Sequence, residues 1–128
     1  MGQYLIDNNI ISNYFAGKFS NKTMIFIGEI IDKTPNISII TEIEALSWVN
    51  SNKIKENIIR DFIKDSRVYN LNPEITAQTI KIRRSRKIKT PDAIIAATAI
   101  VNNFILLTND SDFEGIQNLK LLNPFNDL

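Results

Sequence analysis

Acidic side chains recur where short apolar runs of the sequence end. Asp7 closes the first apolar run, Asp110 follows a later one, and Asp92 begins a helix-like segment. Glu44, or its neighbour Glu42, would lie about one helical turn beyond another short strand. Ligands of open parallel sheets bind beyond the carboxyl ends of the strands. We therefore expect these carboxylates to share one edge of a sheet.

The residue types in the chain restrict the chemistry of such a cluster. The chain has no histidine and no cysteine, which excludes an ordinary zinc site, a cysteine nucleophile and a Ser-His-Asp relay. Carboxylates crowded into one pocket repel one another and lose stability unless a cation neutralises them. Oxygen ligands alone suit Mg²⁺ or Mn²⁺. Such an ion can activate water and polarise a phosphoryl oxygen, so the pattern predicts metal-assisted phosphodiester hydrolysis.

Each acid also has an ordinary structural explanation. Asp7 could cap a helix or form an Asx turn, and residues 109–112 have the composition of a turn. Asp92 could merely complement a helix dipole, and Glu44 could be a solvated helix residue. Their common position at strand ends is what favours a site. Thr108 and Asn9 could hydrogen-bond the carboxylates from the same edge.

A basic segment, residues 81–89, leads directly to Asp92. It predicts contacts with a phosphate backbone beside the acids, and the candidates are Arg83, Arg84 and Arg86. The alternative is a solvated helix face. Too few aromatic residues alternate with the basic ones to form a base-reading surface, so Trp48, Tyr14 and Phe15 are predicted to pack in the core or at an interface.

Hydrophobic periodicity predicts strands that alternate with helices. The expected strands cover residues 4–6, 37–40, 68–71, 104–107 and 119–122. The expected helices cover residues 10–15, 24–31, 42–48, 53–64, a segment opening at Pro73, and 93–101. Gly17 is predicted to end the first helix, and the hydroxyl of Thr90 to cap the last. This alternation indicates an α/β domain with a parallel sheet covered on both faces.

Composition indicates one soluble domain. The chain has 128 residues, of which 44% are apolar, enough for one core. The net charge of +1 provides no overall attraction to nucleic acid. The longest apolar stretch, residues 93–101, is too short to span a bilayer. No leader-like segment opens the sequence, and the lack of cysteine is compatible with a reducing compartment, so we expect a cytoplasmic protein.

Four segments, residues 4–9, 39–44, 91–99 and 106–113, together resemble the PIN-domain ribonucleases, particularly the VapC-like toxins of bacterial type II toxin-antitoxin systems. The Pro-Asp-Ala-Ile-Ile-Ala-Ala-Thr stretch is the most diagnostic of the four. The resemblance covers nearly the whole chain and implies a three-layer α/β/α domain whose acids bind Mg²⁺ or Mn²⁺.

The resemblance also implies roles for individual residues. It assigns catalysis and metal binding to four acids, which are Asp7, Glu44, Asp92 and Asp110. Its Thr-x-x-Glu pattern selects Glu44 over Glu42. It assigns supporting roles to Asn9, Thr41, Thr108 and Asp112. The chain departs from the family at Asn8, where a threonine is usual.

The resemblance implies metal-dependent cleavage of RNA. It also implies that a cognate antitoxin inhibits this activity and that the protein forms a homodimer. A surface around Tyr14, Phe15 and residues 24–31 is expected to bind the antitoxin or a second copy. One alternative is a non-catalytic PIN-like module that binds RNA or protein. Another is a phosphoacceptor receiver domain. A receiver needs a lysine where this chain has residues 108–110, and this difference argues against the second alternative.

Overall fold

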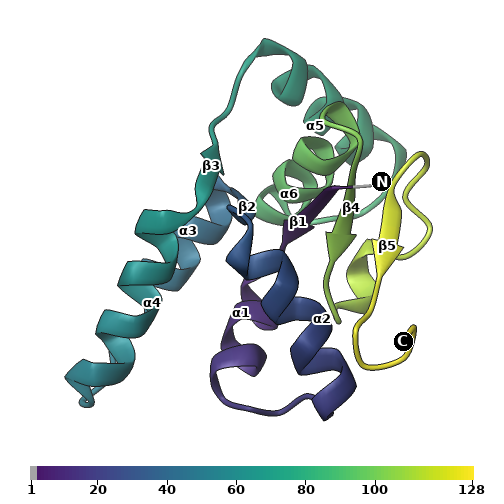
Figure 1. Cartoon of the computed structure of the whole chain (residues 1–128). Helices are drawn as coiled ribbons and strands as arrows, with labels where there is room; N and C mark the ends of the chain where they lie inside the picture. Colours follow the sequence, from purple (N-terminus) through teal and green to yellow (C-terminus); the bar gives the residue numbers. More distant parts are fainter. Residues whose placement is uncertain (1–2) are drawn as a thin grey trace.

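The computed structural model describes residues 3–128 and is built around a parallel five-stranded sheet with the order β3-β2-β1-β4-β5 (Figure 1). The strands are β1 (Gln3–Ile6), β2 (Asn36–Ser38), β3 (Arg67–Tyr69), β4 (Phe104–Leu107) and β5 (Lys120–Leu122). The helices are α1 (Asn8–Phe15), α2 (Asn21–Asp32), α3 (Ile39–Ser47), α4 (Lys53–Asp65), α5 (Pro73–Ser85) and α6 (Thr90–Val101), with a short 3₁₀ helix, η1 (Ser111–Phe113).

The order of the strands reverses at β1, which pairs with β2 on one side and β4 on the other. Ile6 lies opposite Leu107 in the β1–β4 pair. The next residues, Asp7 and Thr108, therefore leave the sheet together at its carboxyl edge. This is the kind of position at which open α/β sheets bind ligands.

Helices cover both faces of the sheet. Neighbouring residues of a strand point to opposite faces, so they belong to different cores. Leu5 and Leu106 belong to a core that also contains residues of α5 and α6. Ile6 and Leu107 belong to a second core, formed with residues of α1, α2, α3 and α4. The sheet thus lies between two helical layers, which confirms the predicted three-layer α/β/α fold.

Helix α6 is buried along most of its length, as the sequence predicted. Its residues 93–99 are all buried, and four of them are alanines. Small side chains let the helix lie close to the sheet and to α5. This close packing sets the position of Asp92 in the first turn of α6.

Two local predictions are wrong. Ile39 and Ile40 begin α3 instead of extending a strand, because the Ser38 hydroxyl accepts a hydrogen bond from the Ile40 N–H at 3.1 Å and caps the helix. Thr90 is the first residue of α6 and not its cap. The cap position belongs to Lys89, which makes no side-chain capping bond.

Helix α1 ends at Phe15, and Gly17 lies in the turn directly after it with a φ of 68°, which confirms that this glycine ends the helix. The beginnings of two helices differ from the prediction. Helix α1 begins at Asn8, because Asp7 caps it by accepting the Asn8 N–H. Helix α2 begins at Asn21, because Ser20 caps it by accepting a bond from the Thr23 N–H. No helix within residues 3–128 is long and apolar enough to cross a membrane.

Candidate metal centre

Asp7 is the most buried acid of the site, with 6% of its surface exposed. One carboxylate oxygen accepts bonds from the Thr108 hydroxyl at 2.7 Å and the Asn9 amide at 3.0 Å. The other accepts the N–H of Asn8 at 2.8 Å, because Asp7 is the N-cap of α1. Asp7 therefore is a capping residue, and its carboxylate is also fixed at the carboxyl end of β1.

Thr108 connects Asp7 to the acidic loop that follows β4. Its hydroxyl accepts the N–H of Asp110 at 3.1 Å, and one Asp110 oxygen accepts the N–H of Asp112 at 2.9 Å. Asn9 adds a second connection, because its side-chain oxygen accepts the N–H of Asn109 at 3.3 Å. These bonds hold the ends of β1 and β4 in one arrangement.

Three carboxylates converge beside this network. Asp92, Asp110 and Asp112 each offer an oxygen, and these oxygens lie within 4.8 Å of one another. They come from the start of α6, the loop after β4 and η1. Asp112, which the resemblance assigned only a supporting role, thus lies beside Asp92 and Asp110.

The charges of the site also affect the pKa values of Asp7 and Glu44. Burial raises the pKa of Asp7, and the charges of Asp92 and Asp110 raise it further, against hydrogen bonds from Thr108 and Asn8 that lower it. Glu44, on the exposed side of α3, also has a raised pKa, first from burial and then from the charges of Asp7 and Asp92. The carboxylates of the site therefore repel one another.

This donor set fits a hard divalent cation. It contains only oxygen ligands, it carries several negative charges, and its repulsion would be relieved by a cation. Thr41 does not join the network: it is fully buried, and its hydroxyl has no hydrogen-bond partner in the part of the chain that the structure describes.

Arg86 has a position that the sequence did not reveal. Its guanidinium donates to the carbonyl of Glu114 at 2.8 Å and to that of Asp112 at 3.4 Å. These carbonyls are 28 and 26 residues away in the sequence, so no local pattern could indicate them. Arg86 therefore holds the acidic loop, whereas Arg83 and Arg84 are exposed.

The variant Arg86→Lys should bind Mn²⁺ about tenfold more weakly, a typical loss when a residue that orients metal ligands is changed. Lysine keeps the positive charge but lacks the planar fork that reaches two carbonyls. Calorimetric titration of the purified chain with Mn²⁺ measures the change. Arg84→Lys is the matched control and should bind like wild type. Equal affinity in the two variants would show that Arg86 does not position the acids.

The raised pKa of Asp92 predicts how stability depends on pH without metal. Burial is its main cause, followed by the charges of Asp110 and Asp112, while Lys89 lowers the pKa. Between the ordinary and the raised value the folded state holds more protons than the unfolded state, so the free energy of unfolding falls as pH rises. The variant Asp92→Asn has no carboxyl group to titrate at this position, so it should not lose stability in this way as pH rises.

We therefore expect the stability of Asp92→Asn, relative to wild type, to increase from acidic to neutral pH. Urea denaturation in EDTA at a series of pH values measures this difference. Asp65→Asn, at the exposed end of α4, should show no such trend. A difference that stays constant with pH would contradict the assigned repulsion.

Comparisons with known proteins agree with this fold. The sequence profile of the PIN domain matches residues 4–119. A chain of a toxin-antitoxin complex from Klebsiella pneumoniae is 27% identical, with a TM-score of 0.74 over 95% of this chain and 98% of that one.

Two further structures are similar in fold. A chain of VapBC2 from Rickettsia felis, bound to a DNA fragment from its promoter, has 23% identity and a TM-score of 0.77 over 94% of this chain and 97% of that one. A chain of FitAcB from Neisseria gonorrhoeae has 20% identity and a TM-score of 0.74 over 96% and 99%. No curated protein matches the chain significantly. The profile match spans most of the sequence, and with it the acids of the sheet edge, so the chain belongs to the PIN domain family.

Proposed function

We propose that this chain is a metal-dependent endoribonuclease that acts as the toxin of a toxin-antitoxin pair in the cytoplasm. The observation that carries the proposal is the convergence of acids from separate segments at one edge of the sheet. Asp92, Asp110 and Asp112 offer oxygens within 4.8 Å of one another, and Asp7 lies within electrostatic reach. Membership of the PIN domain family supports a nuclease.

Asp7, Asp92 and Asp110 would hold Mg²⁺ or Mn²⁺, with Asp112 or Glu44 as a further ligand. When bound, such an ion lowers the pKa of a coordinated water and stabilises charge on the phosphate. Thr108 and Asn9 would keep the Asp7 carboxylate in place through the bonds described above. Because these residues are already oriented, little reorganisation would be needed during the reaction.

Arg83 and Arg84 would contact the RNA backbone. Both are exposed near the end of α5, and the chain then leads into the turn of α6 that carries Asp92. Arg86 lies on the same segment, but its guanidinium already bonds to the acidic loop. We therefore assign direct contact with phosphate mainly to Arg83 and Arg84.

A protein partner is proposed from the structural relatives, which come from toxin-antitoxin complexes. Exposed apolar side chains offer it a surface, since Ile25 of α2 is 64% and Phe15 of α1 41% exposed. These residues belong to the surface that the sequence indicated. Homodimer formation is proposed on the resemblance alone.

The direct experiment incubates the purified chain with cellular RNA in the presence of Mg²⁺ or Mn²⁺ and maps new 5′ ends by sequencing. We expect cleavage at a small set of sites. Co-expression with the product of a small neighbouring gene should suppress the cleavage. An RNA population left intact with both ions would reject the nuclease assignment.

A further inference from the structure

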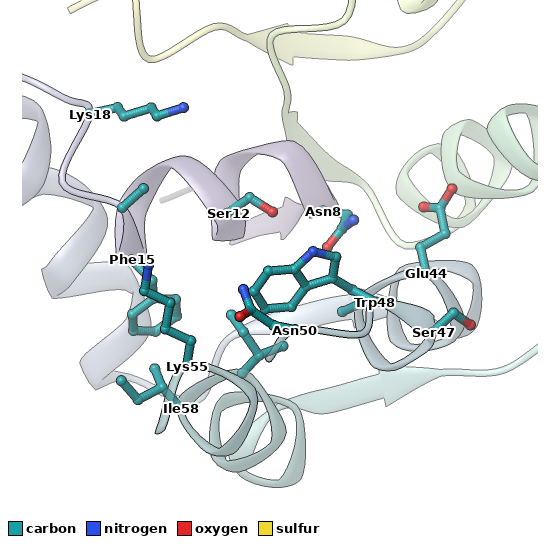
Figure 2. Close-up of a pocket in the computed structure, with 13 residues that line it drawn as sticks. Asn8, Ser12, Phe15, Lys18, Glu44, Ser47, Trp48, Asn50, Lys55 and Ile58 are labelled. Atoms are coloured by element: carbon teal, nitrogen blue, oxygen red, sulfur yellow. The ribbon is translucent and has the colours of Figure 1, made fainter. Parts of the chain in front are cut away.

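A pocket of about 840 Å³ opens beside the acids, between α1, α3 and α4. Figure 2 shows the indole of Trp48 at its centre, between Asn8 and Asn50. Glu44 lies on one side of the indole, and Phe15 and Lys55 lie on the other. None of these side chains belongs to the two buried cores.

The pocket adjoins the candidate metal centre at Asn8 and Glu44. The backbone N–H of Asn8 donates to Asp7 at 2.8 Å, while the side chain of Asn8 lines the pocket. Glu44 lines the pocket too, and its pKa responds to Asp7 and Asp92. A molecule bound at the acids could therefore extend directly into the pocket.

The walls of the pocket combine a flat aromatic surface with unpaired cations. Trp48 is 47% exposed. Lys18 and Lys55 also line the pocket, and neither forms an ion pair within residues 3–128. An exposed aromatic face beside free ammonium groups is the combination with which proteins bind single-stranded nucleic acid.

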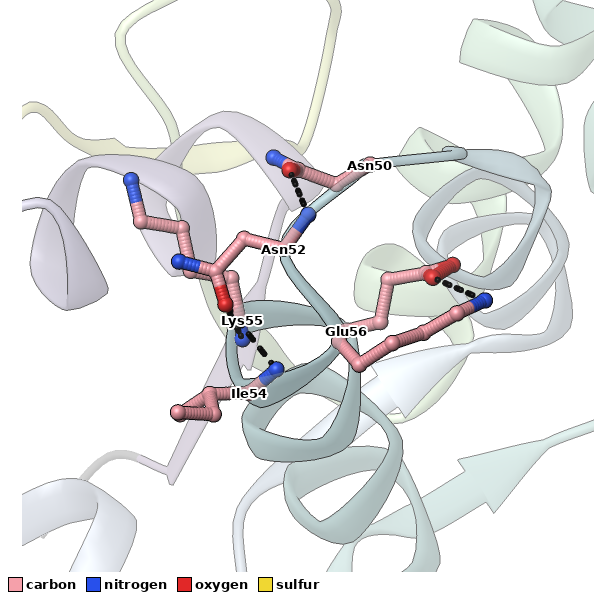
Figure 3. Close-up of polar contacts among 6 residues, drawn as sticks. Asn50, Asn52, Ile54, Lys55 and Glu56 are labelled. Carbon is pink, nitrogen blue, oxygen red and sulfur yellow. Dashed lines mark hydrogen bonds and ion pairs between the residues drawn. The ribbon is translucent and has the colours of Figure 1, made fainter.

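Side-chain hydrogen bonds of two asparagines hold the turn between α3 and α4 (Figure 3). The side-chain oxygen of Asn50 accepts the N–H of Asn52 at 2.7 Å, and that of Asn52 accepts the N–H groups of Ile54 and Lys55 at 3.0 and 3.4 Å. The amide NH₂ of Asn50 makes no hydrogen bond to another residue in the described part of the chain, so it is free to donate to the edge of a base.

We propose that this pocket binds single-stranded RNA next to the cleavage site, with a nucleobase stacked on Trp48 and the adjoining phosphates near Lys18 and Lys55. The inference rests on the proposed function, because it takes RNA as the substrate. The unpaired lysines and the position beside the acids favour a nucleotide over a protein segment. Trp48 then selects for an unpaired base, since a base within a duplex has no free face for stacking.

Trp48 is the only tryptophan of the chain, so its fluorescence reports on the pocket directly. The full chain is titrated in EDTA with a short oligoadenylate and with an oligomer of the same length whose sugars lack bases. We expect the oligoadenylate to quench the fluorescence and the abasic oligomer to leave it nearly unchanged. EDTA separates binding from cleavage, and both oligomers experience the same repulsion from the acids.

Two pairs of variants test the walls of the pocket by fluorescence anisotropy of labelled oligoadenylate. Trp48→Ala should weaken binding about tenfold, within the range for one base-aromatic stack, while Ile43→Ala, an exposed α3 residue outside the pocket, should not. Lys55→Ala should weaken binding and reduce its salt dependence. Lys64→Ala, an exposed residue at the far end of α4, is its control.

Equal quenching by the two oligomers, or none by either, overturns the proposal. So does quenching by a purified antitoxin when RNA causes none, because the pocket would then belong to a protein partner. RNA cleavage without quenching would leave the nuclease assignment intact and reject the pocket. Quenching without cleavage in Mg²⁺ or Mn²⁺ would support the pocket and reject the nuclease.

Discussion

Replacing Asp7 with asparagine should lower RNA cleavage by about two to three orders of magnitude, the usual cost of losing one oriented electrostatic group at a charged transition state. The metal-free variant should unfold at an unchanged or higher temperature. Its side chain keeps the size of the original but carries no charge, so the repulsion from Asp92 and Asp110 that raises the pKa of Asp7 disappears.

Local hydrogen bonding explains why this variant should remain folded. The amide oxygen of asparagine can still accept from the Thr108 hydroxyl and the Asn9 side chain. The bond from the Asn8 N–H is lost, at a cost that relief of the repulsion offsets.

Cleavage of a fluorescent RNA and thermal unfolding in EDTA, measured on the same preparation, test both parts of the expectation. Asp65→Asn, on the exposed end of α4, should retain full activity. Undiminished cleavage by Asp7→Asn would remove Asp7 from the reaction. A large fall in unfolding temperature would mean that the carboxylate serves mainly to stabilise the fold.

Removal of divalent ions should abolish cleavage, and addition of Mg²⁺ or Mn²⁺ should restore it. The same ions should stabilise the fold, because they bind only where the acids are gathered. At a cation concentration about a hundred times Kd the gain is about 2.7 kcal/mol. For a chain of this size such a gain corresponds to a rise in Tm of about 8 °C.

The thermal shift needs two controls. KCl at equal ionic strength should produce little of it, which distinguishes specific binding from screening. The double variant Asp92→Asn/Asp110→Asn should lose it, because two of the three converging carboxylates are gone. Cleavage that persists in EDTA would contradict the metal mechanism, whatever the thermal shift.

Several features could be predicted from the sequence because they follow from local patterns. The apolar residues 104–107 and the buried helix at 93–101 follow from their hydrophobic pattern, and the parallel sheet follows from the alternation of strands and helices. The positions of Asp7 and Asp110 after strands were enough to expect a shared edge. The resemblance to PIN-domain proteins then selected Glu44 over Glu42.

Only the tertiary structure decided which side chains meet. Asp7 and Thr108 are 101 residues apart yet share a hydrogen bond, and Arg86 bonds to a carbonyl 28 residues away. Trp48, predicted to pack in the core or at an interface, lies outside both buried cores and lines the pocket beside the acids. Periodicity reports how a residue is buried within its own helix or strand. Contacts between distant segments depend on strand order and helix packing, which no local pattern contains.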